Sequence, residues 1–258
     1  EGDDTVQINC ILGYFGRARG TAWFDDVRLV RLSSRQLSPS ITIDASKRGE
    51  SISKYIYGQF IEHLGRCIYG GIWAEMLQDR KFCLPVGDEE SPWRTIGDAD
   101  VVMDRERPFV GDHTPRIRLP GGAPAGIAHA GLTVVAGKGY VGRIWLRGDA
   151  TAAPVEVSLV WGDGPDERET SKIGRLGPDY EKHALRFSAH GGSSDARLEV
   201  YSSGSGSFHV GCLSIMPEDN VRGMRSDTLR LLKKLNAPIY RWPGGNFVSG
   251  YDWREGIG

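Results

Sequence analysis

Two segments of the sequence carry the residue types that would bind a polyhydroxylated ligand. The C-terminal run 241–258 contains an arginine at the end of an apolar stretch, a Pro-Gly-Gly turn, Asn246 and several aromatic residues. The segment 57–73 has the same character around Glu62. A carboxylate accepts hydrogen bonds from hydroxyl groups, whereas arginine and asparagine side chains donate them in fixed geometry. The two segments therefore indicate a sugar pocket, in which flat sugar faces would stack on aromatic rings.

The elements that carry these segments are predicted to form a strand–helix–strand unit. Residues 56–62 are interpreted as a short strand that ends in the carboxylate of Glu62, and residues 238–241 as a second strand that ends in Arg241. Between them, residues 226–235 have leucines at helical spacing, with Ser226 as the expected N-cap and Asn236 as the stop. Parallel strands joined by such a crossover bring their carboxyl ends to one edge, which is the active-site face of a TIM barrel. We therefore expect Glu62 and Arg241 to lie in one pocket.

The long segment between the first strand and the helix of this unit is predicted to form an antiparallel β-sandwich of the jelly-roll type. Short alternating runs are separated by Gly, Pro and Asp turns, and the 35 glycines of the chain favour such tight turns. The expected strands are 116–119, 126–130, 132–135, 140–147, 155–161, 181–189, 196–201 and 207–215.

The predicted fold class is therefore an incomplete TIM barrel with an inserted sandwich. Residues 1–36 are interpreted as the last hairpin of another, truncated β-sandwich module, with strands expected at 5–12 and 21–32. The reason is that 20–29 and 206–215 share a pattern of apolar positions, although chance similarity is an alternative. The start of the catalytic domain is placed at 37–82, with a strand at 41–44 and a short helix at 72–82. The inserted sandwich is placed at 83–216, and the barrel continues over 217–258.

The composition excludes several classes of partner. Lysine and arginine number 32 against 33 acidic residues, and no basic cluster is interleaved with aromatic residues, so nucleic acid is not an expected partner. No apolar run reaches the length of about 18 residues that a membrane span requires. The four cysteines have no metal-ligand spacing; we expect free thiols, with a Cys67–Cys83 disulfide as the alternative. No metal or cofactor is expected.

Three blocks of the sequence resemble the start of an α-L-arabinofuranosidase of glycoside hydrolase family 51. The blocks are 57–73, 216–227 and 241–258, in that order along the chain. The intervening sandwich is similar to a carbohydrate-binding-type module. The resemblance implies a retaining (β/α)₈-barrel enzyme that releases terminal α-L-arabinofuranose from arabinoxylan or arabinan.

The resemblance also implies roles for individual residues. Glu62, Arg241 and Asn246 would bond the hydroxyls of the terminal arabinofuranose, and Trp253 would lie at the rim with Tyr251. The family's acid/base and nucleophile lie on later barrel strands, so neither Glu62 nor Glu255 is assigned a catalytic role. We expect the chain to be a fragment that does not turn over substrate by itself.

Alternatives remain open at this point. Glu62 could be a structural carboxylate paired with Arg66 or Arg241, and His63 is interpreted as structural because neighbouring strand residues point to opposite faces. The chain could act only as a carbohydrate-binding unit, or belong to a barrel glycosidase of another specificity such as an endoglucanase. The expected partner is an arabinose-containing plant polysaccharide, and an extracellular location is expected for the same reason. The sequence leaves a homo-oligomer open.

Overall fold

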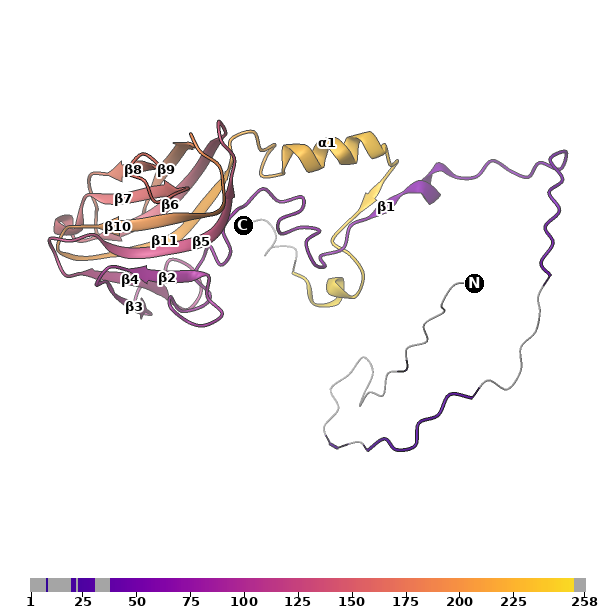
Figure 1. Ribbon diagram of the computed structural model, residues 1–258, viewed down its shortest axis with the longest axis horizontal. Coiled ribbons are helices and arrows are strands. Elements are labelled where there is room, and N and C mark those ends of the chain that lie inside the picture. The colour runs from indigo at the N-terminus through magenta and orange to yellow at the C-terminus, as the bar shows by residue number, and fades with distance from the viewer. Residues whose placement is uncertain (1–7, 9–19, 22, 31–37, 253–258) are drawn as a thin grey trace. The chain divides into compact units, whose positions relative to one another are not determined.

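The computed structural model describes residues 8, 20–21, 23–30 and 38–252 of the chain (Figure 1). By its internal contacts the chain divides into two compact units, Glu1–Ser51 and Ile52–Gly258. The second unit contains the β-sandwich and the strand–helix–strand elements, and the site is described within it.

The described residues of the first unit form no strand. Residues 23–30 and 38–44 have no ladder partner, and Trp23, Ile41 and Ile43 are 90%, 87% and 85% exposed. The strand expected at 41–44 is therefore wrong, as is the described part of the strand expected at 21–32. Alternation alone does not make a strand, which needs a neighbour for its backbone hydrogen bonds. Most of the other half of the hairpin, 5–12, lies outside the described residues.

The predicted antiparallel sandwich is present, and it consists of two five-stranded sheets where eight strands were expected. In spatial order the first sheet is formed by β2 (Trp93–Ile96), β5 (Ala125–Val134), β10 (Ser193–Ser202), β7 (Val155–Val160) and β8 (Arg168–Ile173). The second sheet is formed by β3 (Asp100–Asp104), β4 (Thr114–Leu119), β11 (Gly206–Pro217), β6 (Gly139–Gly148) and β9 (Glu181–Ser188). A short 3₁₀ helix, Ala150–Ala152, follows β6.

Every second residue of the central strands enters the core between the two sheets. On β11, Phe208 and Val210 are fully buried, and on β6 the same holds for Ile144. A β-bulge between Val210 and Cys212 resets the register against β6, so that Leu213 again faces inward. Each such apolar side chain contributes about 1.5–3 kcal/mol on burial, which makes the sandwich the stable part of this unit.

The predicted parallel strand pair is present but short. After a 3₁₀ helix, Lys54–Tyr57, strand β1 (Gln59–Phe60) pairs in parallel with β12 (Tyr240–Arg241), and a 3₁₀ helix, Asn246–Gly250, follows. The connecting helix α1 (Ser226–Leu235) has the predicted bounds. Figure 1 shows α1 and β12 in yellow, beyond the sandwich, with the purple β1 beside them.

The ends of α1 follow the sequence with one exception. Asn236 terminates the helix in the left-handed conformation at φ 53°, as a C-cap asparagine can. The N-cap is Arg225 rather than Ser226, because Ser226 is the first helical residue and its hydroxyl donates to Asp219 Oδ2 at 2.7 Å. None of the helix residues is buried.

The helix expected at 72–82 is wrong: this segment has no helical turn and lies against β11. Met76 N donates to Ile215 O at 3.0 Å, and Leu213 N donates to Arg80 O at 3.1 Å. The buried carboxylate of Glu75 accepts from Ser214 Oγ at 2.6 Å. Leu77 and Phe82, two of the apolar residues that suggested a helix, enter the sandwich core, and the backbone bonds β11 instead of forming helical turns.

Three cysteines lie in the described part of the chain, Cys67, Cys83 and Cys212, and all three are free thiols. The alternative Cys67–Cys83 disulfide is therefore not formed, and Cys10 lies outside the described residues. Within the described ranges no helix is both long and apolar enough to cross a membrane.

Candidate functional site

A parallel hydrogen-bond ladder joins the two segments that the sequence singled out. Gln59 N donates to Ile239 O at 2.9 Å, Ile61 N to Arg241 O at 2.8 Å, and His63 N to Pro243 O at 2.8 Å. The pairing therefore continues past the two residues of β1 and β12 and reaches the Pro-Gly-Gly turn. This places Glu62 beside that turn, at the carboxyl ends of both strands.

The carboxylate of Glu62 packs against the Pro-Gly-Gly turn. Its Oε1 accepts from Gly245 N at 3.2 Å, and the side chain is half-buried. Gly244 has a φ of 125°, and a Cβ at this position would lie 2.6 Å from Glu62 Cγ. Only glycine allows both this backbone conformation and this approach, so the turn is built around the carboxylate.

Replacing Gly244 by alanine is expected to displace Glu62. The added methyl group meets the Cα and Cγ atoms of Glu62, and the positive φ adds strain. For hydrolysis of an aryl α-L-arabinofuranoside, the activity that the family resemblance implies for the full-length protein, we expect catalytic efficiency to fall by at least about tenfold, or about 1.4 kcal/mol. Gly250→Ala is the control, because its Cβ would meet nothing within 4 Å. Equal activity of the two variants would contradict the account.

Arg241 lies at the same end of the strand pair, but its guanidinium group contacts the aromatic ring of Phe60. Its guanidinium carbon is 4.0 Å from the centroid of Phe60, the residue opposite it in the ladder. Among the described residues, neither Arg241 nor Arg66 forms an ion pair with Glu62. The purely structural role considered for Glu62, as an ion-pair carboxylate, therefore has no support in this geometry.

The remaining predicted site residues follow the turn. Asn246 is exposed at the start of the 3₁₀ helix, directly after the glycine that bonds Glu62. The ring of Tyr251 packs edge-on to that of Trp242, with 6.0 Å between centroids. Trp253 lies outside the described residues. The contact of Glu62, Arg241 and Asn246 with a sugar remains a prediction.

A run of aromatic rings leads away from this edge. The ring of His63 meets that of Tyr69 edge-on, with centroids 5.0 Å apart, and Tyr69 is 5.4 Å from Trp73. His63 thus packs in an aromatic contact, in line with the structural role inferred for it. The run connects the Glu62 turn to the segment that lies against the sandwich.

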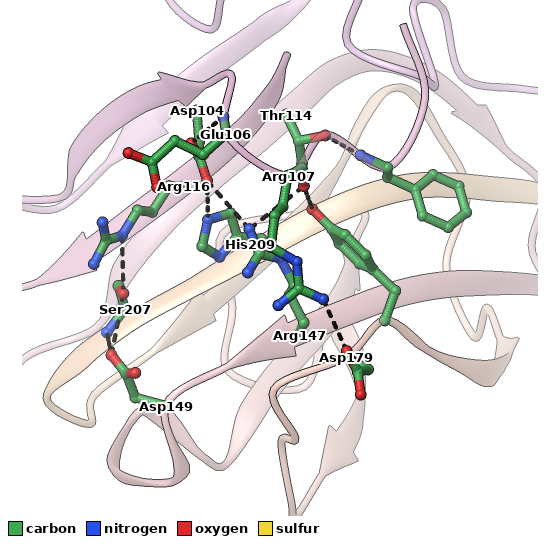
Figure 2. Close-up of polar contacts among 12 residues, drawn as sticks. Asp104, Glu106, Arg107, Thr114, Arg116, Arg147, Asp149, Asp179, Ser207 and His209 are labelled. Carbon is green, nitrogen blue, oxygen red and sulfur yellow. Dashed lines mark hydrogen bonds and ion pairs between the residues drawn. The ribbon is translucent and has the colours of Figure 1, made fainter. Parts of the chain in front are cut away.

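The sequence reasoning missed a second polar cluster, on the outer face of the second sheet (Figure 2). Asp104 Oδ2 lies 2.9 Å from His209 Nε2 and 3.1 Å from Arg147 Nη2. A backbone bond from Glu106, together with His209 and Arg147, lowers the pKa of Asp104, while burial lowers the pKa of His209. The adjoining cavity has a volume of about 300 Å³. Polar residues at alternate positions of β4, β6 and β11 were the available signal.

Further polar contacts surround this cluster (Figure 2). Arg107 donates to Asp179 at 2.8 Å, and Asp149 accepts from the backbone and hydroxyl of Ser207. In the part of the chain that the structure describes, no group of three or more His, Cys, Asp or Glu residues could hold a metal ion.

Comparison with known proteins gives relatives among the α-L-arabinofuranosidases. No protein-family model matches the chain. The chain is 29% identical over 224 residues to an extracellular exo-α-L-arabinofuranosidase of Streptomyces chartreusis, covering 81% of the chain and 26% of that enzyme. It is 60% identical over 41 residues to an intracellular exo-α-L-arabinofuranosidase of Bacteroides ovatus, covering 16% of the chain and 8% of that enzyme.

The chain is a distant homologue of the α-L-arabinofuranosidases. A solved structure of an arabinose-bound family 51 α-L-arabinofuranosidase superposes with a TM-score of 0.63 at 16% identity, over 75% of this chain and 35% of that one. This similarity concerns the fold. The chain spans 26% of the length of its Streptomyces relative.

Proposed function

We propose that the chain is part of a retaining, exo-acting α-L-arabinofuranosidase, and that the turn around Glu62 forms the subsite for the terminal arabinofuranose. One observation carries the proposal: Glu62 is held by Gly245 at the carboxyl ends of two parallel strands, beside Asn246. The homology to arabinofuranosidases supports the choice of sugar.

The chemistry of the turn suits a furanose. Glu62 bonds the turn through Oε1, so its other oxygen remains as an acceptor for sugar hydroxyls. Arg241 supplies donors from an exposed position, and the amide of Asn246 supplies both a donor and an acceptor. Trp253 would add an apolar face at the rim. Together these groups would satisfy hydroxyls on more than one side of the ring.

The strand–helix–strand unit is proposed as the start of a (β/α)₈ barrel. The parallel pairing of β1 with β12, with α1 between them, supports this, since parallel neighbours joined by a helix are the repeating unit of a barrel. Phe60 and Ile239 are 46% and 51% exposed, as expected of strands that further barrel elements would cover. On this proposal, 37–82 and 217–258 belong to the barrel, and 83–216 is the inserted sandwich.

The reaction itself needs two further carboxylates about 5 Å apart, an acid/base and a nucleophile. We assign neither to the residues of this chain, so the proposal places them elsewhere in the full-length protein. The substrate would be an arabinose-containing plant polysaccharide, at an extracellular location like that of the Streptomyces relative.

Two aryl glycosides test the proposed function. The full-length protein should hydrolyse an aryl α-L-arabinofuranoside with retention of configuration and show no comparable activity on an aryl β-glucoside, whereas the 258-residue chain should hydrolyse neither. Preference for the glucoside would indicate another barrel glycosidase. Inactivity of the full-length protein on both, with retained sugar binding, would indicate a carbohydrate-binding role.

A further inference from the structure

The outer face of the second sheet carries a groove of about 960 Å³. Trp145 on β6 forms its centre, opposite Cys212 on β11 and Lys182 on β9 in the strand register. The segment before the sandwich contributes Trp73, and the loop before α1 contributes Arg222. The groove therefore lies where the sandwich meets the segments on both sides of it in the sequence.

All the charged side chains that line this groove are basic. They are Arg80, Lys81, Arg143, Lys182 and Arg222, and no aspartate or glutamate is among the lining residues. Among the described residues, none of the five forms an ion pair. The whole chain carries 32 basic and 33 acidic residues, so this excess of positive charge is local. Five uncompensated cations in one concave surface attract an anionic ligand.

Aromatic rings line the groove between these cations. Phe109 lies against Trp145 with 5.2 Å between centroids, and the absence of a side chain at Gly211 makes room for it, since a Cβ there would lie 2.5 Å from the ring. The guanidinium of Arg80 lies 5.2 Å from the ring centroid of Trp73. Rings beside cations suit a ligand with flat apolar faces and negative charges, which describes a sugar chain that carries carboxylates.

The groove is connected to the proposed arabinofuranose subsite. Trp73, in the groove, is the last ring of the run through Tyr69 to His63, and His63 is the neighbour of Glu62. A polymer held at Glu62 by a terminal sugar could thus continue along aromatic surface into the basic groove.

We propose that this groove binds a uronate-bearing stretch of the polysaccharide whose terminal arabinofuranose enters the Glu62 subsite. The identity of the polymer rests on the proposed function, whereas the binding of acidic sugar does not require hydrolysis. The carboxylates of the uronates pair with Arg143, Lys182 and their neighbours, and the sugar faces lie on Trp145 and Trp73. The selected substrates would be acidic, arabinose-decorated wall polymers in preference to neutral ones.

Calorimetric titration of the 258-residue chain tests the proposal directly. The probes are an oligogalacturonate, a neutral xylo-oligosaccharide of equal length and a single-stranded oligonucleotide. We expect the oligogalacturonate to bind at least about tenfold more tightly than either of the other two probes. Its binding should weaken steeply between 0.05 and 0.5 M salt because added ions screen the charges of the groove. This salt dependence is measured on the unmodified chain and requires no variant to fold.

A double substitution that removes two positive charges tests where the acidic sugar binds. Arg143 and Lys182 are both exposed, so Arg143→Gln with Lys182→Gln should fold normally and weaken oligogalacturonate binding about tenfold. The matched control is Arg175→Gln with Lys234→Gln, which removes the same charge from two exposed positions outside the groove and should leave binding unchanged.

Three results would overturn the proposal: equal affinity for acidic and neutral sugars, equal loss of binding in the control pair, or oligonucleotide binding as tight as that of the uronate. The proposed function fails separately. An aryl arabinofuranoside has no uronate to place in the groove, so the full-length groove variant should hydrolyse it at the unmodified rate. Loss of that activity with intact uronate binding would instead count against the proposed subsite.

Discussion

On the proposed function, replacing Glu62 by glutamine in the full-length protein is expected to lower kcat/KM for an aryl α-L-arabinofuranoside about 100-fold, or about 2–3 kcal/mol. The substitution keeps the size of the side chain and one acceptor oxygen, so the bond from Gly245 can persist. What is lost is the negative charge that we propose accepts hydrogen bonds from sugar hydroxyls, and these bonds would strengthen in the transition state. Steady-state kinetics measures the effect.

A second expected result and a control variant accompany this prediction. Retention of configuration should survive in Glu62→Gln, because we propose that the nucleophile is another residue. Glu89→Gln is the matched control, since Glu89 is exposed and lies within the sandwich, and it should leave kcat/KM unchanged. Complete loss of turnover that azide restores would identify Glu62 as a catalytic carboxylate and contradict its assignment as a binding residue.

Trp93→Ala is expected to give the largest loss of stability, about 3–5 kcal/mol. Trp93 is fully buried in the sandwich core, where its ring lies 4.9 Å from Phe82 and 5.1 Å from His129. Its Nε1 donates to Asp79 O at 3.1 Å, so truncation leaves a cavity and removes one of the two hydrogen bonds that this carbonyl accepts, the other coming from Phe82 N. Chemical denaturation followed by circular dichroism measures the change in unfolding free energy.

The control for Trp93 is another tryptophan of the same chain. Trp23 is 90% exposed, and Trp23→Ala should change stability by no more than about 0.5 kcal/mol. Trp93→Phe should fall between the two, because it keeps ring contacts but removes the donor. If Trp93→Ala were as stable as Trp23→Ala, the segment 79–93 would not be anchored in the core as described.

The sandwich could be predicted because its central strands alternate clearly. The predicted strands at 140–147, 155–161 and 207–215 correspond to β6, β7 and β11 within a few residues. Strand β8 was missed because its sequence, Arg-Glu-Thr-Ser-Lys-Ile, is polar on both faces at the edge of its sheet. β5 was predicted as two strands because Gly131 interrupts the pattern, although the strand continues through it with a shift in register.

The segments outside the sandwich were harder to predict because their structure depends on distant partners. The helix at 226–235 has its own cap and periodicity, and its bounds were predicted correctly. Segment 72–82 has apolar residues at similar intervals, but its backbone bonds β11, which lies over 130 residues away, as in Met76 to Ile215. Local pattern cannot reveal such a partner.

The candidate site was likewise predictable only in part from the sequence. The approach of Glu62 to the 243–246 turn follows from parallel pairing, and that pairing was predictable from strand order. The stacking of Arg241 on Phe60 and the basic groove were not predictable, because they require the register between strands and the placement of the connecting segments. Charge counts over the whole chain also conceal a local excess of basic residues.

The most direct test is a crystal structure of the full-length protein with arabinose bound. The account predicts the sugar at the carboxyl ends of β1 and β12, with a carboxylate oxygen of Glu62 and the amide of Asn246 within about 3.2 Å of its hydroxyls. A sugar bound with no contact to Glu62, Arg241 or Asn246 would contradict the account.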